Sequence, residues 1–286
     1  MHTRFLPLLA GALLSGCGPS GSEGNGVTIS LDKAASASSG GAPLPHIYGT
    51  RAPGRPLVVL DAGHGGKDPG AASPFNGRPE KEVTLAIAKA IGEALAASGK
   101  VRVALTREDD RFLVLTDRYE IARRLGADLF ISIHADAAPG GDSARGATIY
   151  TLSEVASDRQ AALLAREQNE SQRLGGAGAA DGSVSRILID LAQRESMDVS
   201  ARFAALLKRE GEAYFPFRPD YHRFASLVVL KAPDVPSILF ETGYLTNPVD
   251  AAYIQSAQGR TQIAQGMRSA IETYFATRRV KLASAR

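Results

Sequence analysis

A short apolar run that breaks into a glycine-rich loop constrains the fold of this chain more than any other stretch. Residues 58–71 read VVLDAGHGGKDPGA. The apolar residues at 58–60 predict a buried strand, and the glycines after it let the backbone turn sharply and leave room for a bound group. Such a loop is a common way to present a metal ligand, here His64. A lone histidine in a turn also has a simpler structural explanation, so its role depends on the rest of the chain.

Helical and strand patterns alternate after this loop. Residues 80–95 place Val83, Ile87, Ile91 and Leu95 four apart, which is typical of a helix with one buried stripe. Further helices are expected at 115–125, with Thr116 as N-cap and Gly126 as its end, and at 261–275. Further strands are expected at 101–105, 129–133, 147–152, 227–230 and 237–240. This alternation predicts an α/β fold, a single domain with a mostly parallel, mixed central sheet and helices on both faces.

The stretch at 155–211 differs from the rest because it contains two helical patterns and no strand between them. Gly175, Gly176 and Gly178 separate the two patterns. The first ends at Leu174, is strongly polar and has few large apolar side chains, so we expect it to pack weakly. The second, at 187–203, has an apolar face, which is suited to packing or to docking a partner.

The N-terminal residues 1–17 are typical of an export signal. A positive charge at Arg4 precedes an apolar run, and the only cysteine, Cys17, closes the segment in the sequence LSGC. This resembles a bacterial lipobox, which implies lipidation of Cys17 and a membrane anchor. Gly18 follows the cysteine, so the resemblance implies sorting to the outer membrane. An ordinary secretory signal with an incidental cysteine is the alternative.

The segments that flank the main body carry little pattern. Residues 18–55 are rich in Gly, Ser, Ala and Pro and are expected to form a flexible tether, with a short edge strand at 28–31. Residues 278–286 are basic and are expected to fray. The net charge of +3 is too small to indicate a nucleic-acid partner.

Polar residues follow three of the expected strands. His64 follows the first strand, His134 the strand at 129–133, and Glu241 the strand at 237–240. Ligands bind at the carboxyl ends of strands in such sheets, so these side chains are expected to converge. Glu80 begins the helix at 80–95, where the helix dipole alone would favour a carboxylate. Together with the two histidines it makes the three-ligand open set that catalytic zinc uses.

The motifs around these residues give a specific resemblance. LDAGHGGKDPGA, PEKEVTLAIA, SIHAD (132–136) and VLKAPDVPSILFETGYLTN (229–247) resemble the zinc-dependent N-acetylmuramoyl-L-alanine amidases (amidase_3), in particular the periplasmic cell-separation group. The resemblance covers residues 57–277 and implies a catalytic domain at 56–277 that acts on peptidoglycan. It implies zinc on His64, Glu80 and His134, with Glu241 as the catalytic carboxylate.

The resemblance also implies control of the enzyme. In this group the region matching 155–211 is a regulatory insert whose first helix blocks the zinc site and whose second element docks a LytM-type activator. Glu167 or Glu170 would then cap the zinc, although solvated helix charges are the simpler explanation of either residue. Asp61 and Asp136 are candidates for orienting a ligand histidine, or are turn-stabilising residues. His46 and His222 lie outside the motifs and are expected at the surface or in packing.

Two other functions remain open at this point. The chain could be a peptidoglycan-binding module that keeps the fold without catalysis, and the complete ligand set argues against this. It could also be a zinc peptidase that cuts within the stem peptide.

Overall fold

The computed structural model describes residues 42–50, 52, 54–137, 144–174 and 186–284. The expected signal segment with Cys17, and the expected strand at 28–31, lie outside these residues. Within the described part of the chain, no helix is both long and apolar enough to cross a membrane.

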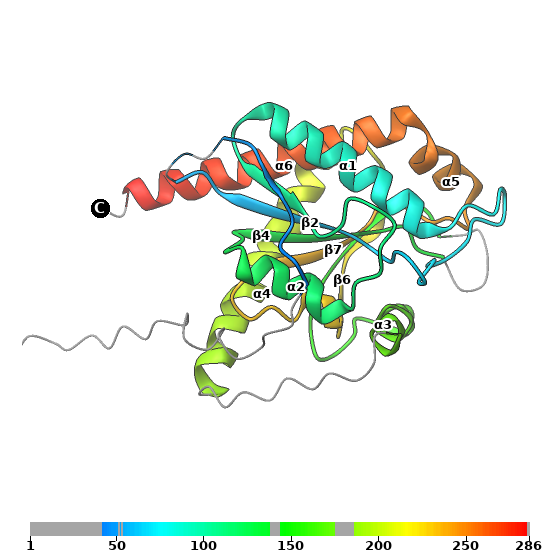
Figure 1. Cartoon of the computed structure of the whole chain (residues 1–286), viewed down its shortest axis with the longest axis horizontal. Helices are drawn as coiled ribbons and strands as arrows, with labels where there is room; N and C mark the ends of the chain where they lie inside the picture. Colours follow the sequence, from blue (N-terminus) through cyan, green and yellow to red (C-terminus); the bar gives the residue numbers. More distant parts are fainter. Residues whose placement is uncertain (1–41, 51, 53, 138–143, 175–185, 285–286) are drawn as a thin grey trace, which may run out of the picture.

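A seven-stranded sheet in the order β1-β3-β2-β4-β7-β5-β6 forms the centre of the fold (Figure 1). Four neighbouring pairs are parallel, and the pairs β1–β3 and β5–β7 are antiparallel. The strands are β1 Ile47–Tyr48, β2 Leu57–Ala62, β3 Arg102–Leu105, β4 Leu129–His134, β5 Ala147–Leu152, β6 Phe217–Ala225 and β7 Ser237–Glu241. The predicted α/β class, with a mixed and mostly parallel sheet, is therefore confirmed.

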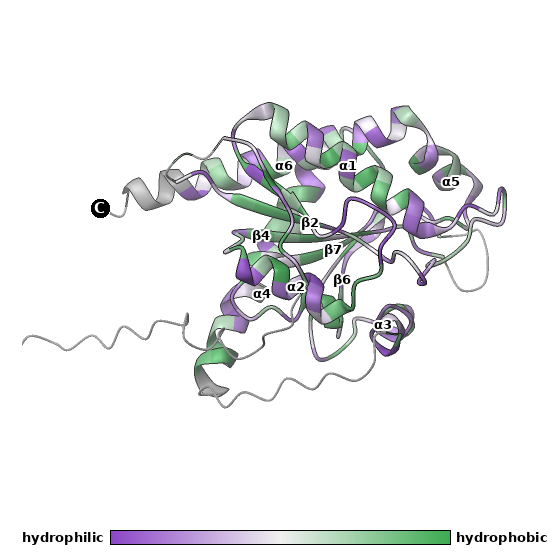
Figure 2. Ribbon diagram, viewed as in Figure 1, coloured by the Kyte–Doolittle hydropathy of each residue, from purple (hydrophilic) through white to green (hydrophobic). Residues whose placement is uncertain are grey.

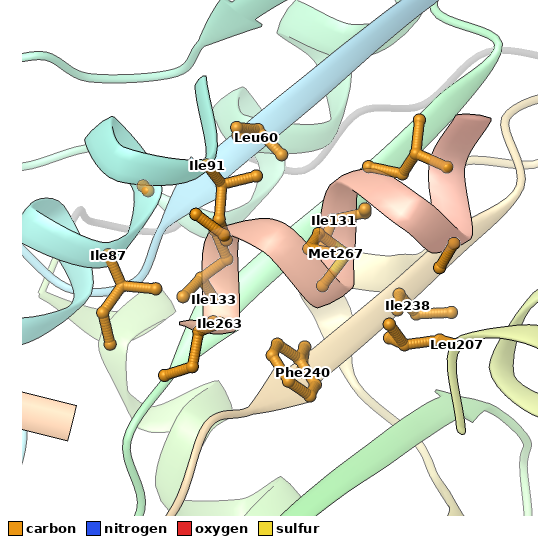
Figure 3. Packing of buried hydrophobic residues seen from close by; sticks show 14 of the residues in the cluster. Leu60, Ile87, Ile91, Ile131, Ile133, Leu207, Ile238, Phe240, Ile263 and Met267 are labelled. Atoms are coloured by element: carbon orange, nitrogen blue, oxygen red, sulfur yellow. The ribbon is translucent and has the colours of Figure 1, made fainter. Parts of the chain in front are cut away.

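Helices cover both faces of the sheet. They are α1 Glu80–Ser98, α2 Leu115–Arg124, α3 Arg159–Arg173, α4 Arg186–Gly211, α5 Pro248–Gln255 and α6 Ala257–Ser284. On one face, α1, α4 and α6 pack on each other and on the central strands (Figure 3). The stripe predicted for α1 is fully buried there: Val83, Ile87, Ile91 and Leu95 are at most 1% exposed.

The opposite face is covered by smaller elements, α2, α3 and a 3-10 helix at Val228–Leu230 (Figure 1). Helix α3 is strongly hydrophilic (Figure 2), and only Ala161, Leu164 and Ala165 contribute apolar side chains to the buried cluster on this face. The metal-ligand candidates lie at the carboxyl ends of the central strands, on the side of the sheet that α2 and α3 cover.

Two expectations about strands were wrong. Residues 227–230 form the 3-10 helix and the turn before it, because their apolar side chains pack into the cluster on the second face without pairing to a strand. The strand β6 was missed. It pairs only with β5 at the sheet edge, and its sequence FRPDYHRFA contains a proline and three charged residues, so it lacks the apolar alternation of a buried strand.

Several element ends also differ from expectation. Val114, not Thr116, is the N-cap of α2, and it makes no side-chain cap. Helix α5 was missed, and Asn247 caps it by accepting hydrogen bonds from the backbone N–H groups of Val249 and Asp250. Helix α6 continues to Ser284 through most of the expected frayed tail, since the residues at 278–284 are mostly good helix formers. Within the expected tether, β1 pairs with β3, so the fold begins before residue 56.

Candidate metal and catalytic centre

Three strand ends bring the candidate residues together. The loop with His64 follows β2, while His134 and Glu241 are the last residues of β4 and β7. The strands β2, β4 and β7 are adjacent and parallel, and His134 pairs directly with Glu241. Side chains paired in register share a face of the sheet, so His134 and Glu241 point to the same side. Glu80 reaches the same place from the first turn of α1.

His64, Glu80 and His134 form one compact, buried cluster. One candidate ligand atom from each lies within 4.8 Å of the others. The Glu80 carboxylate bridges the rings, with Oε2 3.1 Å from His64 Nε2 and Oε1 3.1 Å from His134 Nδ1. The backbone N–H groups of Ala71 and Ala135 each donate to one of its oxygens. These contacts fix the carboxylate and lower the pKa of Glu80 despite its burial, so it is ionised.

The loop sequence is required by close contacts around this cluster. A Cβ at Gly63 would lie 2.4 Å from the His134 ring, and a Cβ at Gly70 would lie 2.7 Å from both Glu80 Oε2 and His64 Cδ2. His64 itself has φ of 61°, a conformation that is uncommon outside glycine. Two buried arginines hold this backbone, because Arg118 donates to the carbonyl of His64 and Arg107 donates to that of Gly63.

The residues of the cluster fit a divalent metal ion. His64 Nε2 is buried and faces Glu80 Oε2 at 3.1 Å without the geometry of a hydrogen bond, while Nδ1 of the same ring lies 3.0 Å from the Asp68 carboxylate. A carboxylate that accepts from Nδ1 leaves Nε2 free to bind a metal, which is the usual arrangement around a zinc-ligating histidine. Two histidines and a carboxylate are also a donor set of catalytic zinc sites. The chemistry and geometry therefore agree with the predicted ligands.

Glu241 lies beside the cluster as a second buried acid. It is 0% exposed, and neither of its carboxylate oxygens has a hydrogen-bond partner among the described residues. Burial, reinforced by the nearby charges of Asp136 and Glu80, raises its pKa well above the ordinary value. Burial and the charges of Glu80 and Glu167 likewise raise the pKa of Asp136 to about 8. The centre thus combines an ionised carboxylate, Glu80, with two neighbouring acids whose pKa values are raised.

The residue that orients a ligand histidine is Asp68, which the sequence reasoning missed. Of the two predicted candidates, Asp61 is engaged elsewhere, since its oxygens bond Arg118, Thr106 and Ser132. Asp136 shows no side-chain hydrogen bond to a histidine among the described residues. Asp68 lies four residues after His64 in the same loop, but Asp61 lies three residues before it, so spacing alone did not identify the partner.

The remaining candidates separate clearly. Glu167 of α3 lies within electrostatic reach of the centre, because part-burial and the charge of Glu80 raise its pKa. Glu170 instead pairs with Arg173 at 3.1 Å on the exposed side of the helix. His222 bonds Thr151 on β5, and His46 stacks edge-on against Tyr48 at the surface.

This fold and site define a class of protein, an α/β protein in which a buried His-Glu-His cluster that fits a metal ion lies beside a second buried carboxylate, as in metal-dependent hydrolases. The sequence profile of one family, N-acetylmuramoyl-L-alanine amidase (Amidase_3), matches residues 58–273. The chain belongs to this family of N-acetylmuramoyl-L-alanine amidases.

Individual relatives agree with the family. The chain is 37% identical over 225 residues to the N-acetylmuramoyl-L-alanine amidase AmiA of Escherichia coli K12, which covers 78% of this chain and 77% of the relative. It is also 37% identical to AmiC of Neisseria meningitidis, with 78% and 53% covered. Among solved structures, the amidase AmiC2 of Nostoc punctiforme superposes with a TM-score of 0.56 at 28% identity, with 78% and 98% covered.

Proposed function

We propose that this amidase uses zinc to hydrolyse the bond between N-acetylmuramic acid and L-alanine of peptidoglycan, and that it acts in daughter-cell separation in the periplasm. The observation that carries the proposal is the buried cluster of His64, Glu80 and His134 next to Glu241. The similarity to AmiA and AmiC supports the same cellular role.

The chain's own residues supply a proton path. His64, Glu80 and His134 would hold the zinc ion, which when bound polarises a carbonyl and lowers the pKa of water from about 15.7 to about 7. Glu241 accepts the proton of the attacking water and passes it to the departing nitrogen of L-alanine, first as general base and then as general acid. Its raised pKa suits a group that must both take and give a proton.

Two kinds of variant test these roles. Alanine at any of the three ligand positions removes one of only three protein ligands, so each variant should lose both metal and activity. Glu241→Gln keeps the shape but cannot take a proton, so it should fold, retain zinc and be inactive. Metal analysis and digestion of purified sacculi distinguish the two classes. An active Glu241→Gln enzyme would place the general base elsewhere.

The two alternatives from the sequence make different predictions. A binding module without catalysis would bind sacculi and release no soluble material with or without a chelator. A zinc peptidase would release fragments whose cut lies inside the stem peptide. The ligand cluster supports catalysis, and the family supports the amide next to the sugar.

We further propose that α3 inhibits the resting enzyme. The helix is attached at both ends beside the centre. Ser171 donates to the Asp68 carboxylate at 2.6 Å, and near the N-terminus of the helix Gln160 accepts from Arg223 at 3.0 Å. Glu167 lies between these ends on the same face of the helix, and its charge acts on Glu80 and Glu241. These contacts favour Glu167 over Glu170 as the residue that caps the metal.

The attachment of α3 is suited to release. Its C-terminal half is held mainly by polar bonds, in which Asn169 bonds the backbone of Ser226 and Val228, and Gln172 bonds Thr116. Such bonds exchange readily with water, so displacing the helix costs less than opening an apolar core. Glu167→Gln should therefore raise activity on sacculi, and Glu170→Gln is the matched control that should leave it unchanged. Equal activity of the wild type and a variant lacking 160–174 would refute autoinhibition.

An activator of the LytM type is proposed to dock on α4. Of its apolar side chains, Leu188 and Leu191 are 42% and 65% exposed, whereas Phe203 and Leu207 are buried. The apolar face of α4 is therefore buried toward its C-terminal end and partly exposed in its first turns. Leu191→Asp should abolish stimulation by an activator without changing basal activity.

The lipid anchor remains a proposal that rests on the LSGC sequence at Cys17. Cys17→Ser should block processing and labelling by palmitate. A wild-type protein that takes up no palmitate would instead be an unanchored periplasmic enzyme.

A further inference from the structure

Two arginines on the edge strand β6 form a polar cluster beside the catalytic centre. Arg223 is 3% exposed, and its Nη1 donates to Tyr150 at 3.2 Å. Arg218 pairs with the exposed Asp220 and donates from Nη1 to the buried hydroxyl of Tyr244 at 2.7 Å.

A short chain of contacts joins this cluster to the catalytic carboxylate. The Tyr244 hydroxyl lies 3.5 Å from Thr148 Oγ1, and Thr148 pairs directly with Glu241 across the β5–β7 ladder. The charge of Arg218 also acts on Asp136 and lowers its pKa, which opposes the larger effect of burial. Arg218 therefore lies at the same end of the sheet as the reacting groups.

The N-terminal end of α3 accepts hydrogen bonds from both arginines. Gln160 Oε1 accepts from Arg223 Nη1 at 3.0 Å and from Arg218 Nη1 at 3.4 Å, and Asp158, the N-cap of α3, pairs with Arg223. In this state two arginines face two carboxylates, those of Asp158 and Asp220. Displacing α3 removes Asp158 and leaves the cluster with one excess positive charge and several unpaired donors.

We propose that Arg218 and Arg223 form a subsite for a carboxylate of the stem peptide, and that α3 fills this subsite at rest with Asp158 and Gln160. The inference rests on the proposed amidase function and names the substrate feature that the site selects. The residue after L-alanine in the stem peptide is a γ-linked D-glutamate with a free α-carboxylate. Two extended residues reach about 7 Å from the scissile amide, which suits a subsite adjacent to the centre. Arginine matches the planar geometry of such a group.

The test compares two synthetic glycan fragments that differ at one group. One carries a stem peptide with D-glutamate, and the other carries D-isoglutamine, in which an amide replaces the α-carboxylate. The zinc-loaded full chain should give a kcat/KM about tenfold higher for the acid, as expected for a hydrogen bond to a charged group. Because α3 inhibits cleavage of both substrates alike, the ratio of the two kcat/KM values does not depend on the resting position of the helix.

Variants show whether Arg218 causes the preference. Arg218→Gln should bring the ratio of kcat/KM for the acid to kcat/KM for the amide close to one, and Arg218→Lys should retain part of the preference. Arg209→Gln is a matched control, because Arg209 is exposed and pairs with its neighbour Glu210 on α4. A wild type without preference, or an equal loss on both substrates in Arg218→Gln, would overturn the subsite. Failure of every protein, including the variant lacking 160–174, to cleave either fragment would instead refute the amidase function on which the subsite rests.

Discussion

Replacing Asp68 by asparagine should weaken metal binding although Asp68 is not a ligand. Its Oδ2 accepts from His64 and Ser171, and its Oδ1 accepts from the backbone N–H of Gly70. An asparagine must place its NH₂ against one of these donors. If the NH₂ group faces the N–H of Gly70, two donors oppose each other. If the NH₂ group faces His64, Nδ1 must accept, and the ring proton then sits on Nε2, the atom that should bind metal.

The size of the expected loss in metal affinity follows from the usual effect of removing a carboxylate that orients a ligand histidine. A carboxylate that orients a ligand histidine contributes about 10- to 100-fold in metal affinity, or about 1.4–2.7 kcal/mol. Competition with a zinc-chelating dye measures the dissociation constant directly, and a melting curve of the metal-free protein reports any loss of folding. Asp110→Asn is the matched control, since Asp110 accepts from Gly66 in the same loop but contacts no ligand. Wild-type affinity in Asp68→Asn would refute this account of the ring orientation.

Two further predictions concern the same loop. Gly70→Ala should abolish zinc binding, because the added Cβ would lie 2.7 Å from Glu80 Oε2. Gly77 has a similar φ of +70° but no atom within 4 Å of an added Cβ, so Gly77→Ala should bind zinc normally. Equal metal content in the two variants would contradict the clash. At about pH 7 the metal-free protein should carry a proton on His64, since burial lowers its pKa but Glu80 and Asp68 raise it more, to about 9. Zinc binding should then release about one proton, and the apparent affinity for zinc should fall about tenfold per pH unit below that pKa. Calorimetry in two buffers with different ionisation enthalpies measures the proton release. A binding enthalpy that does not depend on the buffer would contradict it.

The central strands and α1 could be predicted because their patterns are strong and local. The buried stripe of α1 and the apolar runs of β2, β4 and β7 follow directly from side-chain periodicity. The edge strand β6 could not be found in this way, because it pairs with β5 alone and its sequence includes a proline and three charged residues. The apolar run at 227–230 was mistaken for a strand, because a buried loop segment has the same apolar pattern as a buried strand.

The clustering of the candidate ligands could be predicted, but their surroundings could not. His64 and His134 follow recognisable strands, and motifs identify Glu80 and Glu241. Which aspartate orients His64 depends on side-chain geometry within one loop, and spacing alone does not distinguish Asp61 from Asp68. The arginine cluster on β6 was invisible for a further reason, because it exists only through contacts between β6, α3 and the segment after β7.

The most direct test of the central claim is the identity of the bond that is cut. Purified sacculi would be digested with the zinc-loaded protein, with and without a chelator, and the products analysed by mass spectrometry. The account predicts chelator-sensitive release of intact stem peptides with a free L-alanine amine, and glycan strands that carry a free lactyl carboxyl group. Products cut within the stem peptide, or equal release in the presence of chelator, would contradict it.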